Sequence, residues 1–253
     1  MAFDSKTNTE RHITVEATTQ EPTTHARQEY LPKPKPERKG VALCLSGGGF
    51  RAALFHLGAL RRLNELGILS LIDMISSVSG GSIIAAHLAS RLQPWPNRTA
   101  AFPNWDENVA APFRQFTSRN IRTPAILKRL LPWNWLRSST GVRALATEYE
   151  HSLARKGEQP LRLAELPERP LFIFCATDMA FGVNWIFTRN EVGDYQAGYA
   201  QTPNDWTVGR AVAASSCFPP VFNPLPVGLK PDQFRNGKAR PKATMWSVFL
   251  ICG

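Results

Sequence analysis

The sequence predicts an α/β protein with a mostly parallel central sheet, and two stretches of the same plan lead to this prediction. Residues 41–45 and 74–78 are short apolar runs, and each ends at glycines and is followed by helical spacing. A strand covered on both faces reads as a near-continuous apolar run, and a following helix returns the chain to the next strand. A chain of 253 residues is long enough to bury one core of this class.

The first of these strands ends at a glycine turn, Gly47-Gly48-Gly49. Leucines follow at three-residue steps, and Gly67 stands where a helix would end. Glycines let a ligand atom approach the backbone closely, and free amides at a helix N-terminus favour negative charge. The turn therefore suits either a phosphate or a developing oxyanion.

The second strand ends at a serine turn, Ser77-Val78-Ser79-Gly80-Gly81, and the predicted helix after it covers 82–92. A serine on a tight strand-to-helix turn has its hydroxyl exposed, and the usual pattern there is Gly-x-Ser-x-Gly. Here Ser77 replaces the first glycine, which a small residue permits, while Gly81 keeps the last. Ser82 is interpreted as a cap of the new helix.

The two turns together, Gly-Gly-Gly-Phe-Arg-Ala and then Ser-Val-Ser-Gly-Gly-Ser, resemble those of the patatin-like phospholipases. The resemblance implies a three-layer α/β/α fold and a Ser–Asp dyad. It implies that Ser79 is the nucleophile and that Gly47, Gly48 and Gly49 supply oxyanion-hole amides, with Arg51 beside them. It continues through 172–178 and through the Ala-Ser-x-x-x-Pro segment at 214–219, covering about 40–226.

One part of the family pattern is missing. The resemblance implies a catalytic Asp in an Asp-Gly-Gly or Asp-Gly-Ala motif, but this chain contains no Asp-Gly dipeptide. Asp178 matches a non-catalytic family position and Asp232 lies in a polar loop, so neither is assigned as the base. Residues 246–251 are apolar enough for a strand, and the chain is expected to stop before the strand that bears the Asp.

The rest of the chain supplies further elements. Strands are predicted at 172–174 and 183–187, and Asp205 or Thr207 is expected to cap a helix at 208–215. His56 and His87 are interpreted as packed histidines. Residues 1–39 are polar and basic and predict a disordered leader, followed by a patatin-like domain over 40–253, truncated before the Asp strand.

The charge and composition of the chain limit the kinds of partner that it is expected to bind. Thirty Lys and Arg against 20 Asp and Glu give +10, which favours an anionic partner, although solubility alone would also explain it. Between 108 and 147 basic residues alternate with Phe, Leu and Trp, which suits a membrane interface or equally a helical insertion packed on the sheet. Nucleic acid is not expected, because no RNA-binding motif accompanies these residues. The four widely spaced cysteines are interpreted as buried free thiols of a reducing compartment.

The sequence therefore predicts a serine lipid acyl hydrolase that acts on phospholipid or related glycerolipid esters at an anionic membrane surface, without metal or cofactor. The expected location is cytoplasmic, with peripheral membrane contact. The alternatives are a non-catalytic lipid-surface protein, an α/β-hydrolase esterase using Asp106 and His151, and a nucleotide binder using the glycine turn.

Overall fold

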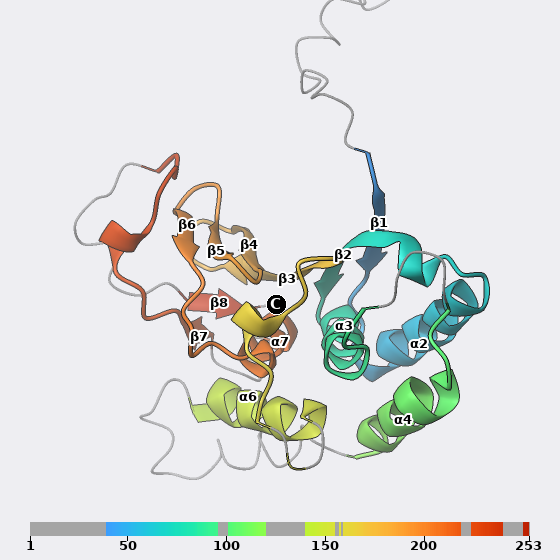
Figure 1. Ribbon diagram of the computed structural model, residues 1–253. Helices are drawn as coiled ribbons and strands as arrows, with labels where there is room; N and C mark the ends of the chain where they lie inside the picture. The colour runs from blue at the N-terminus through green and yellow to red at the C-terminus, as the bar shows by residue number, and fades with distance from the viewer. Residues whose placement is uncertain are drawn as a thin grey trace, which may run out of the picture. The chain divides into compact units, whose positions relative to one another are not determined.

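The computed structural model describes residues 39–95, 101–119, 140–154, 157, 159–218, 224–239 and 250–252. From Gly40 onward the chain forms one compact unit. The predicted leader lies outside the described residues except for Lys39. The elements, in chain order (Figure 1), are β1 Val41–Leu45, α2 Gly49–Glu65, η1 Leu69–Leu71, β2 Ile72–Val78, α3 Gly80–Arg91, η2 Asp106–Ala110, α4 Ala111–Thr117, α6 Thr140–Leu153, η4 Leu163–Glu165, β3 Leu171–Asp178, β4 Val183–Phe187, β5 Glu191–Asp194, β6 Gly198–Gln201, α7 Val208–Ser216, β7 Leu225–Pro226, η5 Pro231–Gln233 and β8 Leu250–Cys252.

One mixed sheet organises these elements, in the order β1-β2-β3-β4-β5-β6. Pairing is parallel from β1 to β3, where α2 and α3 make the crossovers, and antiparallel from β3 to β6. The α/β class is confirmed, but the expectation of a mostly parallel sheet is corrected. The turns between β3 and β6 are too short to carry the chain back to a parallel start.

The described helices pack on one face of the sheet. In Figure 1, α2, α3, α6 and α7 lie on the same side of the strands, with α3 against α2 and α7, and α7 against α6. Along β3, Phe172, Phe174 and Ala176 are buried, whereas Thr177 on the other face is exposed. The third layer of the predicted α/β/α arrangement is not among the described residues.

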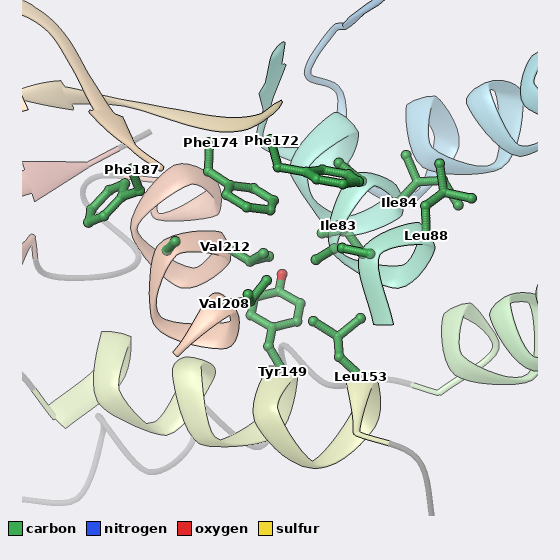
Figure 2. Packing of buried hydrophobic residues seen from close by; sticks show 14 of the residues in the cluster. Ile83, Ile84, Leu88, Tyr149, Leu153, Phe172, Phe174, Phe187, Val208 and Val212 are labelled. Atoms are coloured by element: carbon green, nitrogen blue, oxygen red, sulfur yellow. The ribbon is translucent and has the colours of Figure 1, made fainter. Parts of the chain in front are cut away.

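The core lies between this sheet face and α3, α6 and α7 (Figure 2). Phe172 and Phe174 project from the sheet toward Ile83 of α3 and Val212 of α7, and Tyr149 rises from α6 between these helices. Burying such aromatic and branched side chains contributes about 1.5–3 kcal/mol each. This core fixes α3 and α7 against the strands, and both helices carry residues of the candidate site.

Local predictions hold best where periodicity and turn residues agree. β1 and β4 have the predicted bounds. Gly67, with φ 71, follows α2, and its N–H donates to the Asn64 carbonyl at 2.9 Å. Thr207 caps α7 by accepting from the Arg210 N–H. Among the described cysteines Cys44 is exposed rather than buried, because it lies on the edge strand β1.

A candidate serine site at the carboxyl end of the sheet

Ser79 occupies the turn between β2 and α3, and its backbone is strained. Its φ of 52° and ψ of −115° are values that a non-glycine residue rarely adopts. Such a conformation costs about 1–3 kcal/mol and persists only where the surroundings hold it. The side chain is partly exposed. The turn therefore has the form of the sharp serine elbow that the sequence predicts.

Gly80 and Gly81 allow this turn to lie against the neighbouring backbone. A Cβ on Gly80 would sit 2.2 Å from the Gly49 carbonyl oxygen, and a Cβ on Gly81 would sit 2.2 Å from that of Leu45. No side chain fits at either position. The start of α3 thus packs directly on the end of β1 and on the glycine turn.

The glycine turn lies beside the serine. A Cβ on Gly47 would be 3.3 Å from the Ser79 Cβ, which places the two turns in van der Waals contact. Gly48 and Gly49 adopt φ values of 132° and 64°, and no side chain caps the first amides of α2. The structure therefore brings together the serine and the amide-bearing turn that the sequence predicts as its partner.

His56 fastens the strand end that leads into this glycine turn. It lies on α2 and is largely buried, and its Nε2 is 3.0 Å from the Ser46 carbonyl oxygen and 3.3 Å from the Ser46 Oγ. The N–H of Nε2 donates to the carbonyl oxygen. Arg51, in contrast, is exposed on the first turn of α2.

Three further serines lie beneath the turn. Ser82 donates to the Ser77 Oγ at 3.1 Å, and the Ser77 hydroxyl donates to the Ile173 carbonyl of β3 at 3.2 Å. Ser82 also lies 2.8 Å from the Ser215 Oγ, which accepts the Ser79 N–H at 2.9 Å. The interpretation of Ser82 as a helix cap is wrong, because α3 begins at Gly80 and turns this hydroxyl into the interior.

Sequence reasoning missed Ser215 as a site residue. The Ala-Ser segment that contains it matches the family pattern, but that match carries no role for the hydroxyl. Ser215 is completely buried near the end of α7. Its contact with Ser79 joins positions far apart in the chain, so no local signal could have found it.

Among the described residues, the carboxylates weighed from the sequence are either engaged elsewhere or exposed. Asp178 is buried at the end of β3, where its Oδ1 accepts the Ala180 N–H at 2.7 Å. Burial, together with the adjacent Asp194, raises the pKa of Asp178 to about 6. Asp232 is exposed in η5. For the esterase alternative, Asp106 pairs with Arg61 at 3.2 Å, and His151 is exposed on α6.

Strand β8 joins the sheet beyond the carboxyl end of β2. It pairs with β3 at Thr177 and Asp178, beyond the last β2–β3 pair between Val78 and Cys175. Strand β8 therefore lies on the same side of β3 as β2 does, beyond the point where β2 ends at the serine turn. Its sequence, Leu-Ile-Cys, contains no carboxylate.

His87 has a packing role on α3. It is buried against the Phe113 ring, and its Nε2–H donates to the Val109 carbonyl at 2.9 Å. Burial lowers its pKa to about 4, so the ring is neutral near pH 7. It ties the serine helix to η2, as expected of a packed histidine.

The basic and aromatic stretch at 108–147 is described only in part. Phe113 and Phe116 are buried in the core, whereas Arg114 and Arg119 are exposed. These two rings therefore pack inside the protein instead of facing a membrane. Residues 120–139, with both tryptophans of the stretch, lie outside the described residues.

The described ranges also bear on metal binding and on membrane spanning. No group of three or more His, Cys, Asp or Glu side chains within these ranges is arranged to hold a metal ion. Within the same ranges, every helix falls short of the length and apolarity needed to cross a bilayer.

A serine elbow against a glycine turn, at the carboxyl end of an α/β sheet, defines a class of serine-dependent hydrolase folds. The sequence model of the patatin-like phospholipases matches residues 43–239. The chain belongs to the patatin-like phospholipase family, whose members are hydrolases.

Individual relatives are distant. A patatin-like phospholipase domain-containing protein of Aspergillus oryzae is 26% identical over 185 residues, covering 73% of this chain and 22% of its own length. One from Neurospora crassa is 26% identical over 201 residues, covering 79% and 20%. The chain thus spans about a fifth of the curated relatives that it matches.

Among solved structures, the chain is similar in part to a human GIVD cytosolic phospholipase A2 in complex with methyl gamma-linolenyl fluorophosphonate. It has a TM-score of 0.46 and 18% identity, and the match covers 72% of this chain and 30% of that one. VipD from Legionella pneumophila has a TM-score of 0.38 and 15% identity, covering 85% and 46%.

Proposed function

We propose that this chain carries the nucleophile and oxyanion hole of a lipid acyl hydrolase that acts on phospholipid or related glycerolipid esters. The observation that carries the proposal is the contact between the strained Ser79 turn and the glycine turn. A Cβ added to Gly47 would lie 3.3 Å from the Ser79 Cβ. A carbonyl carbon beside the Ser79 Oγ would have its oxygen close to the Gly47–Gly49 amides.

The reaction follows from these groups. The Ser79 Oγ attacks the ester carbonyl carbon, and the negative oxygen that forms accepts hydrogen bonds from the glycine amides, where one donor contributes about 3 kcal/mol. The carbon–oxygen bond to the alcohol breaks, a lysolipid or alcohol leaves with a proton, and water then releases the fatty acid from Ser79. The base that takes the Ser79 proton is unassigned, and without one the rate falls by orders of magnitude.

Fluorophosphonate labelling tests the proposal directly. The Ser79 Oγ bonds to phosphorus, fluoride leaves, and the hydroxyl proton passes to base or solvent. We expect one adduct by intact mass, none in Ser79→Ala, and an unchanged adduct in Ser118→Ala, which removes an exposed serine on the same chain. An adduct that persists in Ser79→Ala would contradict the assignment.

The net charge of +10 and the absence of an Asp-Gly dipeptide favour a second candidate, a lipid-surface protein without turnover. Membrane attachment from the cytoplasmic side would then rest on charge attraction to anionic headgroups. Cosedimentation with phosphatidylserine vesicles, compared with phosphatidylcholine vesicles, tests this candidate. Binding that needs the anionic lipid, with no Ser79 adduct, would favour it over the enzyme.

A further inference from the structure

The hydroxyl groups beneath the serine turn form one directed chain. Each serine hydroxyl has a single proton to donate. Ser77 gives its proton to the Ile173 carbonyl, and Ser82 gives its proton to Ser77. The 2.8 Å contact between Ser82 and Ser215 therefore uses the Ser215 proton. Ser215 in turn accepts the Ser79 N–H.

This chain is fully satisfied and sealed from water. Ser82 and Ser215 are completely buried and Ser77 nearly so, and each hydroxyl donates once and accepts once. It runs from the backbone of the serine turn through α7, α3 and β2 to the backbone of β3. Buried polar networks of this kind hold a single geometry, because any displacement leaves a polar group without its partner.

We propose that Ser215 is a positioning residue for the nucleophile, holding the Ser79 backbone in its strained, positive-φ conformation through the Ser79 N–H. The inference rests on the proposed function of Ser79 and adds a residue on a distant helix. A turn in a sparsely populated conformation needs such external restraint. Without the Ser215 Oγ, the amide of Ser79 has no acceptor in its present position, and the turn relaxes toward an ordinary conformation.

Ser216 provides a matched control. It is the next residue on the same helix and is also buried, but its hydroxyl bonds to Tyr149 and to the Val212 carbonyl, away from Ser79. Ser215→Ala and Ser216→Ala each remove one buried hydroxyl from α7, so both are expected to lower the melting temperature. Ser215→Thr keeps a hydroxyl at the same position.

Two measurements on the full chain test the proposal. The first is hydrogen exchange of the Ser79 amide, which does not depend on any chemistry at Ser79. We expect exchange to accelerate at least tenfold in Ser215→Ala relative to wild type, since the loss of one buried hydrogen bond corresponds to about a tenfold change. In Ser216→Ala, where the bond to the Ser79 N–H is kept, we expect exchange to stay within about twofold of wild type. Equal exchange in both variants would overturn the proposal.

The second measurement is the rate constant for phosphonylation of Ser79 by a fluorophosphonate. We expect at least a tenfold loss in Ser215→Ala, partial recovery in Ser215→Thr and little change in Ser216→Ala. A wild-type rate in Ser215→Ala would overturn the positioning role. If the wild-type chain is not labelled at all, the proposed hydrolase function fails, and the exchange experiment still decides whether Ser215 holds the turn.

Discussion

At the scale of single residues, Gly81 is the position where the serine turn tolerates least change. An added Cβ would lie 2.2 Å from the Leu45 carbonyl oxygen, 2.6 Å from its carbon and 2.8 Å from the Leu45 Cβ. Because backbone blocks it, α3 must shift away from β1. We expect Gly81→Ala to lower the free energy of unfolding by about 3 kcal/mol, measured by urea denaturation.

Gly58 is the matched control for this substitution. It lies in the middle of α2, its φ is not positive, and a Cβ there meets nothing within 4 Å. Gly58→Ala is expected to raise the free energy of unfolding by about 0.5–1 kcal/mol, since alanine favours the helix. Equal unfolding midpoints for the two alanine variants would show that the close approach at Gly81 does not restrain the turn.

Residue type and spacing were sufficient to predict the two strand-to-helix turns, at Gly47–Gly49 and at Ser79, because a strand end, a glycine and a helical period are all local features. Ser215 and the contact of His56 with Ser46 could not be predicted this way. A hydroxyl in an alanine-rich helix and a histidine among leucines are compatible with many environments. Only the packing of α7 on α3, and of α2 beside the end of β1, gives these side chains their partners.

At the scale of elements, Asn64 attaches the segment before η2 to helix α2. It is buried, its Nδ2 donates to the Phe102 carbonyl at 3.0 Å, and its Oδ1 accepts the Phe102 N–H at 2.8 Å. Asn64→Leu would leave both backbone groups buried without partners. We expect it to lower the free energy of unfolding by about 2–4 kcal/mol, measured by urea denaturation.

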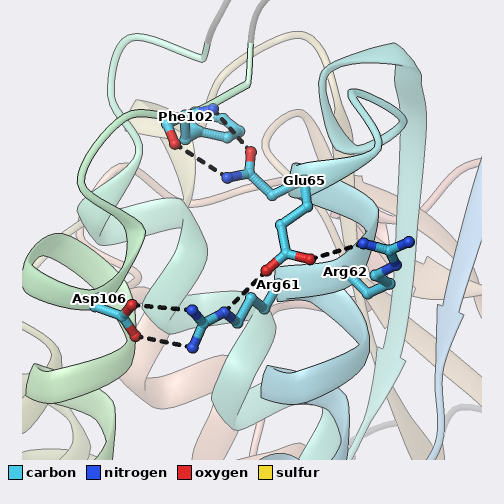
Figure 3. Close-up of polar contacts among 6 residues, drawn as sticks. Arg61, Arg62, Glu65, Phe102 and Asp106 are labelled. Carbon is cyan, nitrogen blue, oxygen red and sulfur yellow. Dashed lines mark hydrogen bonds and ion pairs between the residues drawn. The ribbon is translucent and has the colours of Figure 1, made fainter.

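Arg61 links the same two elements at the surface and serves as the comparison. Figure 3 shows its guanidinium between Glu65 of α2 and Asp106 of η2, at distances of 3.1 and 3.2 Å. These side chains are about half exposed, so solvent screens the pairs, and Arg61→Ala is expected to cost less than about 1 kcal/mol. If Arg61→Ala proved as costly as Asn64→Leu, the buried amide would not be the principal attachment.

The elements also show where sequence interpretation fails. The hairpin of β5 and β6 was not predicted, because Gly193, Asp194 and Gly198 resemble turn residues. In the structure Asp194 ends β5, and its carboxylate accepts the N–H groups of Gln196 and Ala197 at 2.6 and 2.7 Å, which closes the turn into β6. Strands of four residues are too short to show a clear alternation of apolar and polar side chains. The glycines in them let the two backbones pair closely.

At the scale of the whole molecule, a pair of buried carboxylates couples stability to pH. Asp178 ends β3 and Asp194 ends β5, both are fully or almost fully buried, and they interact through their side chains. Asp194 accepts the N–H groups of Gln196 and Ala197, and Asp178 accepts the Ala180 N–H. Burial and the interaction with Asp194 raise the Asp178 pKa to about 6, against about 4 in an unfolded chain.

The sign of the effect follows from the raised pKa. Below about pH 4 Asp178 is protonated in both the folded and the unfolded chain, so the stabilisation is fully present. Between about pH 4 and 6 the folded state keeps a proton that the unfolded state releases, and the free energy of unfolding falls as the pH rises, by at most about 3 kcal/mol in total. Above that range Asp178 is ionised in both states.

Asp178→Asn isolates this contribution, because an amide remains neutral at every pH and its Nδ2 can donate to Asp194 as the protonated acid does. We expect wild type to lose stability relative to Asp178→Asn between pH 4 and pH 7, measured by urea denaturation at each pH. Asp232→Asn, which neutralises an exposed carboxylate in η5, should leave the wild-type pH dependence in place. Parallel pH curves for wild type and Asp178→Asn would show that folding does not raise the pKa of Asp178.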